Sequence, residues 1–326
     1  MTLQSTTTTP TTPEAGARRL GRPTSALPPG SRSRRRRETL AAYLFLAPDL
    51  IGLLAFVALP MLLAFGVALY RVDGFGGYTY IGLDNYRTML HDPQFWGSLK
   101  VTCIYVVTLV PSVFVVSLGL ALLVRDRFRG VGWVRAAFFL PNVVSLVVVA
   151  LIWQFLLVDK RGIAAQALEP IGLGKLSFLG SPKLALGTYV VVSIWFLMGF
   201  LMLIFLTGLT DIPRELEEAA ALDGAGRWGR FRHVTWPLLR PTSFFVVVQA
   251  TVGSVTGVQA FDLVYVLTKG GPANATSTIV FYMYQQAFTF NNIGYASAMT
   301  TVVVAILVLA TGAMFAMTRG GRFDHE

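Results

Sequence analysis

From about residue 40 onward, long apolar runs alternate with shorter polar stretches along the chain. A helix needs about 20 apolar residues to cross the hydrocarbon core of a bilayer, and six runs are of that length. They lie near residues 42–70, 101–124, 136–158, 184–209, 243–267 and 296–317. The pattern predicts an all-α integral membrane protein with about six transmembrane helices.

Prolines interrupt several of these runs. Pro48 and Pro60 predict bends in the first run, which is long enough to tilt or to project from the bilayer. Pro111 lies in the second run and Pro141 near the start of the third. A proline within a transmembrane helix is tolerated where neighbouring helices satisfy the freed carbonyl. The prolines therefore do not argue against the six predicted spans.

Composition agrees with a membrane protein and excludes some chemistry. Hydrophobic residues make up 54% of the chain and charged residues 13%, and the mean hydropathy is +0.60. The one cysteine, Cys103, excludes an intrachain disulfide and a cysteine metal site. The net charge of +10 raises the possibility of a nucleic-acid partner, which the distribution of the charges along the chain argues against.

Lys and Arg are unevenly divided between the two sets of loops. Eight lie in the N-terminal tail, four between the second and third runs, five between the fourth and fifth, and two at the C-terminus. These make nineteen of the 27, and the other loops hold eight. Because basic residues accumulate in cytoplasmic loops, both termini and the loop at 211–241 are predicted to be cytoplasmic.

Residues 1–38 are mainly Thr, Pro, Ser, Gly and Arg, a composition that predicts a disordered cytoplasmic tail. Its Arg34 to Arg37 precede the first apolar run, where they favour an anchor on anionic lipid over a twin-arginine export signal. The run that follows is too long for an export signal and lacks a small-residue cleavage site. We therefore divide the chain into this tail, a membrane domain at 39–320 and a short cytoplasmic tail at 321–326.

The loop at 211–241 has a helical pattern of its own. Pro213 suits a first helical turn, and the residues after it, from Glu215 to Leu222, have helical spacing. Asp223-Gly224 predicts the end of this helix, because glycine tolerates a left-handed backbone. A second short helix is expected at about 226–235, closed by Pro237 and Pro241. A simple amphipathic loop on the membrane surface would not need glycine and proline at these positions.

This loop resembles the EAA loop of the membrane subunits of ABC importers. The resemblance rests on Glu218-Ala219-Ala220, on Gly224 four residues later, and on Val234-Thr235-Trp236-Pro237 after nine more. The family's usual ending is Ile-x-Leu-Pro, so Val234 and Trp236 depart from it.

Further motifs are similar to those of the sugar-importer branch, and together they cover most of residues 40–318. They are Ile81 to Tyr86, Asp92 to Trp96, Phe138 to Pro141, Leu267 to Pro272, Ser277-Thr278, Tyr282 to Phe288 and Gly294 to Ala298.

The resemblance implies a type I ABC importer permease fold whose cytoplasmic coupling helix sits in a cleft of an ATPase subunit. It also implies a second homologous permease, two cytoplasmic ATPase subunits that bind ATP and Mg²⁺, and an external solute-binding protein. By the same resemblance, Glu215 and Glu218 would contact the ATPase, and Ala219 and Ala220 would allow close approach. Gly224 would set the bend that transmits motion, and Asp223 and Pro237 complete the predicted coupling site.

Polar residues within the spans are the candidates for contact with cargo. A charge in a span is costly and by default marks a functional site, which points to Asp262. Gln259 and Asp262 share a helix face, and with Phe261 they supply the polar groups and ring that hold a sugar. Equally, Asp262 lies near the outer end and could serve only to cap or pair within the bundle, with Lys269 as one partner. Weaker candidates are Trp195, Phe200 and Asn142.

Enzymatic motifs are missing from the sequence. The three histidines lie far apart, and there is no GxSxG elbow and no GxxxxGK[ST] phosphate loop. We therefore expect a transporter subunit without catalytic residues, without a metal and without an ATPase site of its own. An ion-coupled secondary transporter that uses Asp262 is the alternative, and a membrane-anchored scaffold is a third class. The absence of a basic pair in the spans favours a neutral sugar over a phosphorylated one.

Overall fold

The computed structural model describes residues 31–72, 77–126, 128–158, 162–171 and 176–318. The chain forms two units, residues 1–59 and 60–326, and we describe each by itself. The described part of the first unit is helix α1 (Ser31–Leu53) followed by the π-helical turn η1 (Leu54–Ala58). The predicted tail at 1–38 overlaps this helix from residue 31, because the arginines there are good helix formers. Residues 1–30 lie outside the described residues.

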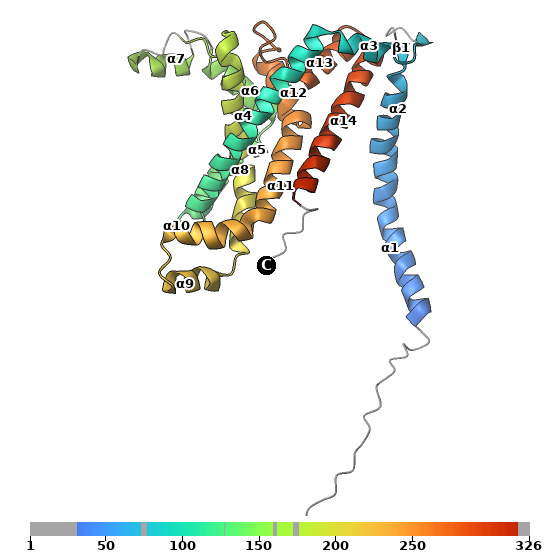
Figure 1. The fold of residues 1–326 in the computed structure, drawn as a ribbon. Helices are drawn as coiled ribbons and strands as arrows, with labels where there is room; N and C mark the ends of the chain where they lie inside the picture. The colour runs from blue at the N-terminus through green and yellow to red at the C-terminus, as the bar shows by residue number, and fades with distance from the viewer. Residues whose placement is uncertain (1–30, 73–76, 127, 159–161, 172–175, 319–326) are drawn as a thin grey trace, which may run out of the picture. The chain divides into compact units, whose positions relative to one another are not determined.

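The second unit is almost entirely helical and is coloured from blue to red in Figure 1. It opens with α2 (Leu59–Val67), which begins at the last residue of the first unit, and with the antiparallel strands β1 (Tyr70–Val72) and β2 (Tyr78–Tyr80), in which Arg71 pairs with Thr79. The helices that follow are α3 (Asp84–Leu90), α4 (Pro93–Leu123), α5 (Val131–Val143), α6 (Leu146–Leu156), α7 (Ile163–Leu168), α8 (Pro182–Thr210), α9 (Arg214–Leu222), α10 (Arg227–Arg230), α11 (Trp236–Thr256), α12 (Val258–Leu267), α13 (Ile279–Tyr284) and α14 (Ile293–Met317). Three short helical turns complete it, η2 (Glu169–Ile171), η3 (Phe231–Thr235) and η4 (Gln285–Thr289).

Five helical stretches among the described residues are long and apolar enough to cross a membrane. They are Ala41–Val67, Pro93–Leu123, Pro182–Thr210, Arg227–Thr256 and Ile293–Met317. A sixth is counted if α5 and α6, which meet at an angle of 96°, form one broken span. The predicted all-α architecture with about six spans is confirmed.

The third predicted span is broken instead of continuous. Helix α5 ends at Val143, and the extended backbone of Val144 and Ser145 redirects the chain into α6. Helix α5 also lies very close to α8, because a Cβ on Gly199 would come within 1.9 Å of the Phe138 carbonyl oxygen. Only glycine permits this approach, so the packing of α5 on α8 is fixed by backbone contact.

The fifth predicted span begins earlier and ends earlier than expected. The expected short helix at 226–235 does not close at Pro237, and α10, η3 and α11 form one candidate span from Arg227 to Thr256. The π-turn explains this continuity, because the Trp236 N–H donates to the Phe231 carbonyl and widens the turn ahead of Pro237. The span stops at Gly257, whose extended backbone starts α12 as a separate helix.

Helices α4 and α8 form the centre of the second unit. The rings of Tyr105 and Tyr189 stack with centroids 4.3 Å apart, and both side chains are fully buried. The Tyr105 hydroxyl donates to Ser193 Oγ at 2.9 Å, and the Tyr189 hydroxyl donates to the Gln259 carbonyl at 3.1 Å. Buried hydroxyls are therefore paired, and they tie α4, α8 and α12 into one core.

Candidate functional site

Helix α9 is a short helix with a defined beginning and end. Pro213 is the residue immediately before it, one position earlier than a first-turn proline. At the other end the Gly224 N–H donates to the Ala221 carbonyl and the Ala225 N–H to the Ala220 carbonyl. Gly224 has a φ of +85°, so these bonds form a Schellman cap. The predicted helix end at Asp223-Gly224 is confirmed.

One face of α9 is exposed together with the turn that follows it. Glu215, Glu218, Ala219 and Asp223 are exposed, and Ala220 is half-buried. Leu222 is 90% exposed on the same helix, and Trp228 is 71% exposed just beyond it. Exposed acids beside large exposed apolar side chains are typical of a surface that another protein covers. Pro237 is half-buried and lies away from this face, at the start of α11.

Glu217 is the acid of α9 that binds within the chain, and it was missing from the predicted site. Arg125 Nη1 donates to Glu217 Oε1 at 2.7 Å, and the Thr235 hydroxyl donates to the same oxygen at 3.1 Å. The pattern Glu217-Glu218 could have indicated two opposite roles, because neighbouring residues of a helix point in different directions. Only the fold brings Arg125, 92 positions earlier, to this place.

Arg125 lies between α4 and α5, so the ion pair places the α4–α5 loop beside the 211–241 loop. Figure 1 shows α9 and α10 at one end of α4, α8 and α11, with α3 and α13 at the opposite end. The two loops richest in arginine are thus on one side of the bundle, as the charge distribution requires.

The predicted cargo residues on α12 have separate surroundings. Gln259 is buried and its Nε2 donates back to the Gly253 carbonyl at 2.8 Å. Asp262 is half-buried, and no hydrogen bond or ion pair links it with Lys269 or with another described residue. Phe261 stacks on Tyr265 with centroids 5.4 Å apart and lies 4.8 Å from the Tyr284 ring. The suggested Asp262–Lys269 pair is therefore absent, and a role in cargo binding stays a prediction.

The weaker cargo candidates lie on the faces of α8 and α5. Trp195 meets Trp153 edge to face with ring centroids 5.5 Å apart, and it packs with Phe200 against the main core. Asn142 is half-buried next to the break between α5 and α6. No hydrogen bond joins these side chains to Gln259 or Asp262 within the described part of the chain, and Trp195, Phe200 and Phe261 all pack against the same apolar core. Their role in cargo binding stays a prediction.

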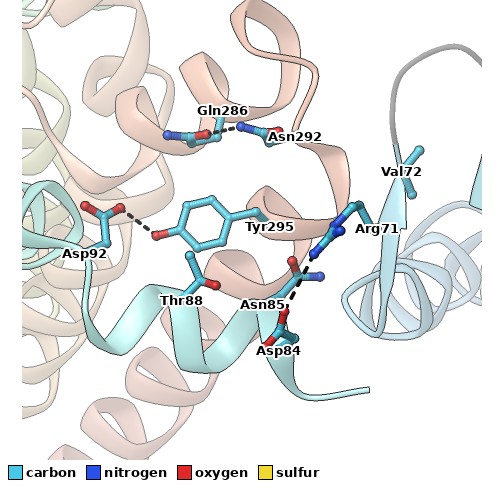
Figure 2. A pocket seen from close by; sticks show the side chains of 10 residues that line it. Arg71, Val72, Asp84, Asn85, Thr88, Asp92, Gln286, Asn292 and Tyr295 are labelled. Atoms are coloured by element: carbon cyan, nitrogen blue, oxygen red, sulfur yellow. Dashed lines mark hydrogen bonds and ion pairs between the residues drawn. The ribbon is translucent and has the colours of Figure 1, made fainter. Parts of the chain in front are cut away.

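A polar junction at the opposite end of the bundle joins segments far apart in sequence (Figure 2). Asp92 precedes α4 and accepts the Gln94 N–H at 2.8 Å, which caps the helix. The hydroxyls of Tyr282 and Tyr295 both donate to Asp92 Oδ2 at 2.6 Å. Asn292 donates to Gln286 at 3.0 Å, and Gln286 donates to Tyr282 at 2.9 Å.

The junction borders a cavity of about 370 Å³ that opens between β1, α3 and the start of α14. Arg71 and Asp84 form an exposed ion pair at its rim, with Nη2 and Oδ2 3.7 Å apart. Asn85 donates to the carbonyls of Ala68 and Tyr70 at 2.8 and 3.0 Å, which holds the strand against α3. Most of the polar side chains described at this cavity and junction bond to other parts of the chain. We therefore interpret the junction as a structural contact between segments.

Electrostatics at Asp92 favour the charged carboxylate. Burial acts to raise the pKa of Asp92, but the hydrogen bonds from Tyr282, Tyr295 and the backbone N–H groups of Gln94 and Phe95 outweigh it. The net result is a pKa below the ordinary value of an aspartate. The same contacts raise the pKa of Tyr282, with burial as the larger cause and its bond to Asp92 as the second.

No group of three or more His, Cys, Asp or Glu side chains within the described ranges could hold a metal ion. The two candidate functional features are thus an exposed acidic helix at one end of the bundle and, at the other end, a polar junction whose side chains bond to one another. Together with a bundle of membrane-spanning helices, they define a multi-pass membrane protein with a short, exposed acidic helix outside the spans.

Comparison with known proteins gives the family. The model of the family "Binding-protein-dependent transport system inner membrane component" matches residues 101–320, so the chain belongs to that family. The "Probable ABC transporter permease protein YurN" of Bacillus subtilis is 37% identical over 278 residues, which cover 83% of this chain and 93% of YurN. The "Trehalose/maltose transport system permease protein MalF" of Thermococcus litoralis is 31% identical over 291 residues, covering 89% and 96%.

A solved structure has the same fold. In the crystal structure of a bacterial ABC transporter involved in the import of the acidic polysaccharide alginate, one chain matches with a TM-score of 0.76 at 24% identity. The match covers 89% of this chain and 98% of that chain. The importer-permease architecture expected from the sequence is therefore confirmed, and the chain is a membrane transport subunit.

Proposed function

We propose that this chain is a permease subunit of an ABC importer for a sugar or sugar-like solute. It pairs with a second, homologous permease to form the translocation path, and an extracytoplasmic binding protein delivers the solute. Relatives named as permeases for trehalose/maltose and for sulfoquinovosyl glycerol support this class of cargo. A neutral solute is favoured over a phosphorylated one, because the six apolar runs of the sequence hold no basic pair that would bind a phosphate.

Two cytoplasmic ATPase subunits drive the transport, one of them docked on α9. ATP and Mg²⁺ bind to those subunits, because this chain has no phosphate-binding loop. Closure of the ATPase dimer moves the coupling helices together and turns the cavity from inward-facing to outward-facing. Hydrolysis then resets it. Both termini and the α9 end of the bundle lie in the cytoplasm in this arrangement.

The exposed face of α9 is the observation that carries the proposal. Glu215, Glu218 and Ala219 face solvent, while a Schellman cap ends the helix at a defined residue. An exposed acidic side chain contributes little to the stability of its own chain. We assign Glu215 and Glu218 to contacts in the ATPase cleft, where the small side chains of Ala219 and Ala220 allow close approach.

A pull-down from detergent-solubilised native membrane tests this function with the intact chain and a Glu218→Arg variant. The intact chain is expected to recover an ATPase and a second permease, and the variant to lose the ATPase. Glu169→Arg serves as the matched control, because Glu169 is exposed in η2, outside α9. Its ATPase recovery is expected to be unchanged. Recovery of the intact chain alone, still active in uptake, would overturn the proposal in favour of ion coupling through Asp262.

A further inference from the structure

Glu217 joins three segments through a single oxygen. Its Oε1 accepts from Arg125 Nη1 at 2.7 Å and from Thr235 Oγ1 at 3.1 Å. Arg125 follows the end of α4, Glu217 lies on α9, and Thr235 is the last residue of η3, from which α11 continues. Any displacement of α9 must therefore move these neighbours or break two hydrogen bonds.

Helix α9 has little other attachment to the bundle. None of its residues is buried, and along the helix only Glu217 and Ala220 are even half-buried. The apolar anchor of the loop is Ile212, which is 5% exposed and precedes the helix. Among the described residues, the ion pair between α9 and the bundle is the one that Glu217 forms with Arg125.

The partner of Glu217 is itself well anchored. Arg125 directly follows Val124, whose side chain is fully buried at the end of α4. The Val124 carbonyl accepts Arg135 Nη2 at 2.6 Å, and Arg135 lies in the second turn of α5. A displacement of Arg125 should therefore move the end of α4 and the start of α5. Helix α5 in turn packs against α8 at Gly199.

We propose that Glu217 is a positioning residue that transmits the movement of α9 to α4 and α11. Glu218 next to it faces the ATPase, so the neighbouring glutamates have separate tasks, one outward and one inward. This assignment rests on the proposed function, because it takes α9 to be the helix that the ATPase moves. It differs from that function in predicting a residue that affects coupling without affecting docking.

The burial of the pair gives the contact its stiffness. Both side chains are 21% exposed, so water screens their attraction less than it would at an open surface. A charge-assisted bond of 2.7 Å is also short, and Thr235 holds the carboxylate in place while it forms. Breaking the pair leaves a half-buried charge without its ionic partner, which should loosen the joint while α9 keeps its own backbone hydrogen bonds and cap.

A charge-exchange experiment tests the proposal in the assembled transporter, reconstituted with its ATPase, second permease and binding protein. The variants are Glu217→Arg, Arg125→Glu and the double exchange of both. Arg129→Glu is the matched control, because Arg129 is exposed in the same loop and forms no ion pair with a described residue. Solute imported per ATP hydrolysed is measured, along with ATPase recovery in the pull-down.

Each single reversal is expected to lower the solute imported per ATP by about tenfold, while the ATPase is still recovered. The double exchange should restore most of this ratio, and Arg129→Glu should leave it unchanged. Normal coupling in the single variants, or no rescue in the double one, overturns the proposal. Loss of ATPase recovery in Glu217→Arg overturns it too, because Glu217 would then be a docking residue. Failure of the intact chain to recover an ATPase overturns the proposed function instead, and the inference with it.

Discussion

The two ends of the helical bundle use acidic side chains in opposite ways. At the α3–α14 end, Asp92 accepts hydrogen bonds from a helix terminus and from two tyrosines, all of them within its own chain. At the α9 end, Glu215 and Glu218 face solvent, and Glu217 alone of the three binds inward.

This difference separates residues that hold the fold together from residues available to another molecule. Asp92 and Glu217 are half-buried acids with partners in their own chain, and leaving such an acid unpaired would cost free energy. An exposed acid has no such requirement, so its contribution to stability is small. Substitutions at the first end should therefore change stability, whereas substitutions at the second end should change transport.

The largest stability effect is expected for Asp92→Ala. The change leaves two tyrosine hydroxyls without their acceptor and removes the cap of α4, which should lower the free energy of unfolding by about 3 kcal/mol. Thermal unfolding in detergent, followed by tryptophan fluorescence, measures the loss. Asp84→Ala is the control, because its ion pair with Arg71 is exposed and should contribute no more than about 0.5 kcal/mol. Equal effects of the two variants would contradict the comparison.

A smaller stability effect, of about 1 kcal/mol, is expected for Gly224→Val at the other end. A β-branched residue disfavours the positive φ of this position, so the Schellman cap should loosen. ATP hydrolysis should then continue without a matching rate of transport. Solute uptake and ATP hydrolysis are measured in the same vesicles, with the amount of chain in the membrane as the check on folding.

Gly226→Val is the matched control for this loop. Gly226 has a φ of −66° in extended backbone, and a Cβ there would meet no atom within 4 Å. Valine should therefore be tolerated with normal coupling. If Gly224→Val transports normally, or if both variants are equally impaired, the bend at Gly224 does not transmit motion.

The smallest effect is a pH dependence confined to the Asp92 junction. The pKa of Asp92 is lowered in the folded protein, so its stabilising contribution is present above the ordinary aspartate pKa and is lost as pH falls through the folded value. The difference in Tm between the unmodified chain and Asp92→Asn should stay constant from neutral pH down to about 4, and then shrink. A difference that declines between pH 7 and 5 would mean that the hydrogen bonds do not favour the carboxylate.

Much of the fold could be predicted from the sequence, because membrane spans are set by local composition. The apolar runs gave the positions of α4, α8 and α14 to within a few residues, except that α4 starts eight residues earlier, at Pro93. The end of α9 at Asp223-Gly224 was also predictable, since a left-handed glycine is a local requirement. The type of each element depended on residues close together in the chain.

The deviations lie where helices meet or where a proline is accommodated. The break between α5 and α6 depends on the extended backbone of Val144 and Ser145, and the continuation of α10 through η3 into α11 depends on the Trp236–Phe231 backbone bond. No apolar pattern encodes either feature. A π-turn lets the chain pass Pro237 without ending the helix, so the proline alone could not locate the boundary. The ring neighbours of the predicted cargo side chains, Trp153 for Trp195 and Tyr265 for Phe261, likewise follow from helix packing and not from sequence order.

By itself, then, the sequence determined that the chain crosses a membrane about six times, and its motifs indicated an importer permease with a docking helix at 211–241. Only the tertiary structure decided that Glu217 turns inward to Arg125 while Glu218 faces out, and that Asp92 joins α4 to α13 and α14. Apolar length and turn residues act over a few neighbouring positions, which a sequence displays directly. Ion pairs and hydrogen bonds between residues some 90 to 200 positions apart exist only once the helices have packed.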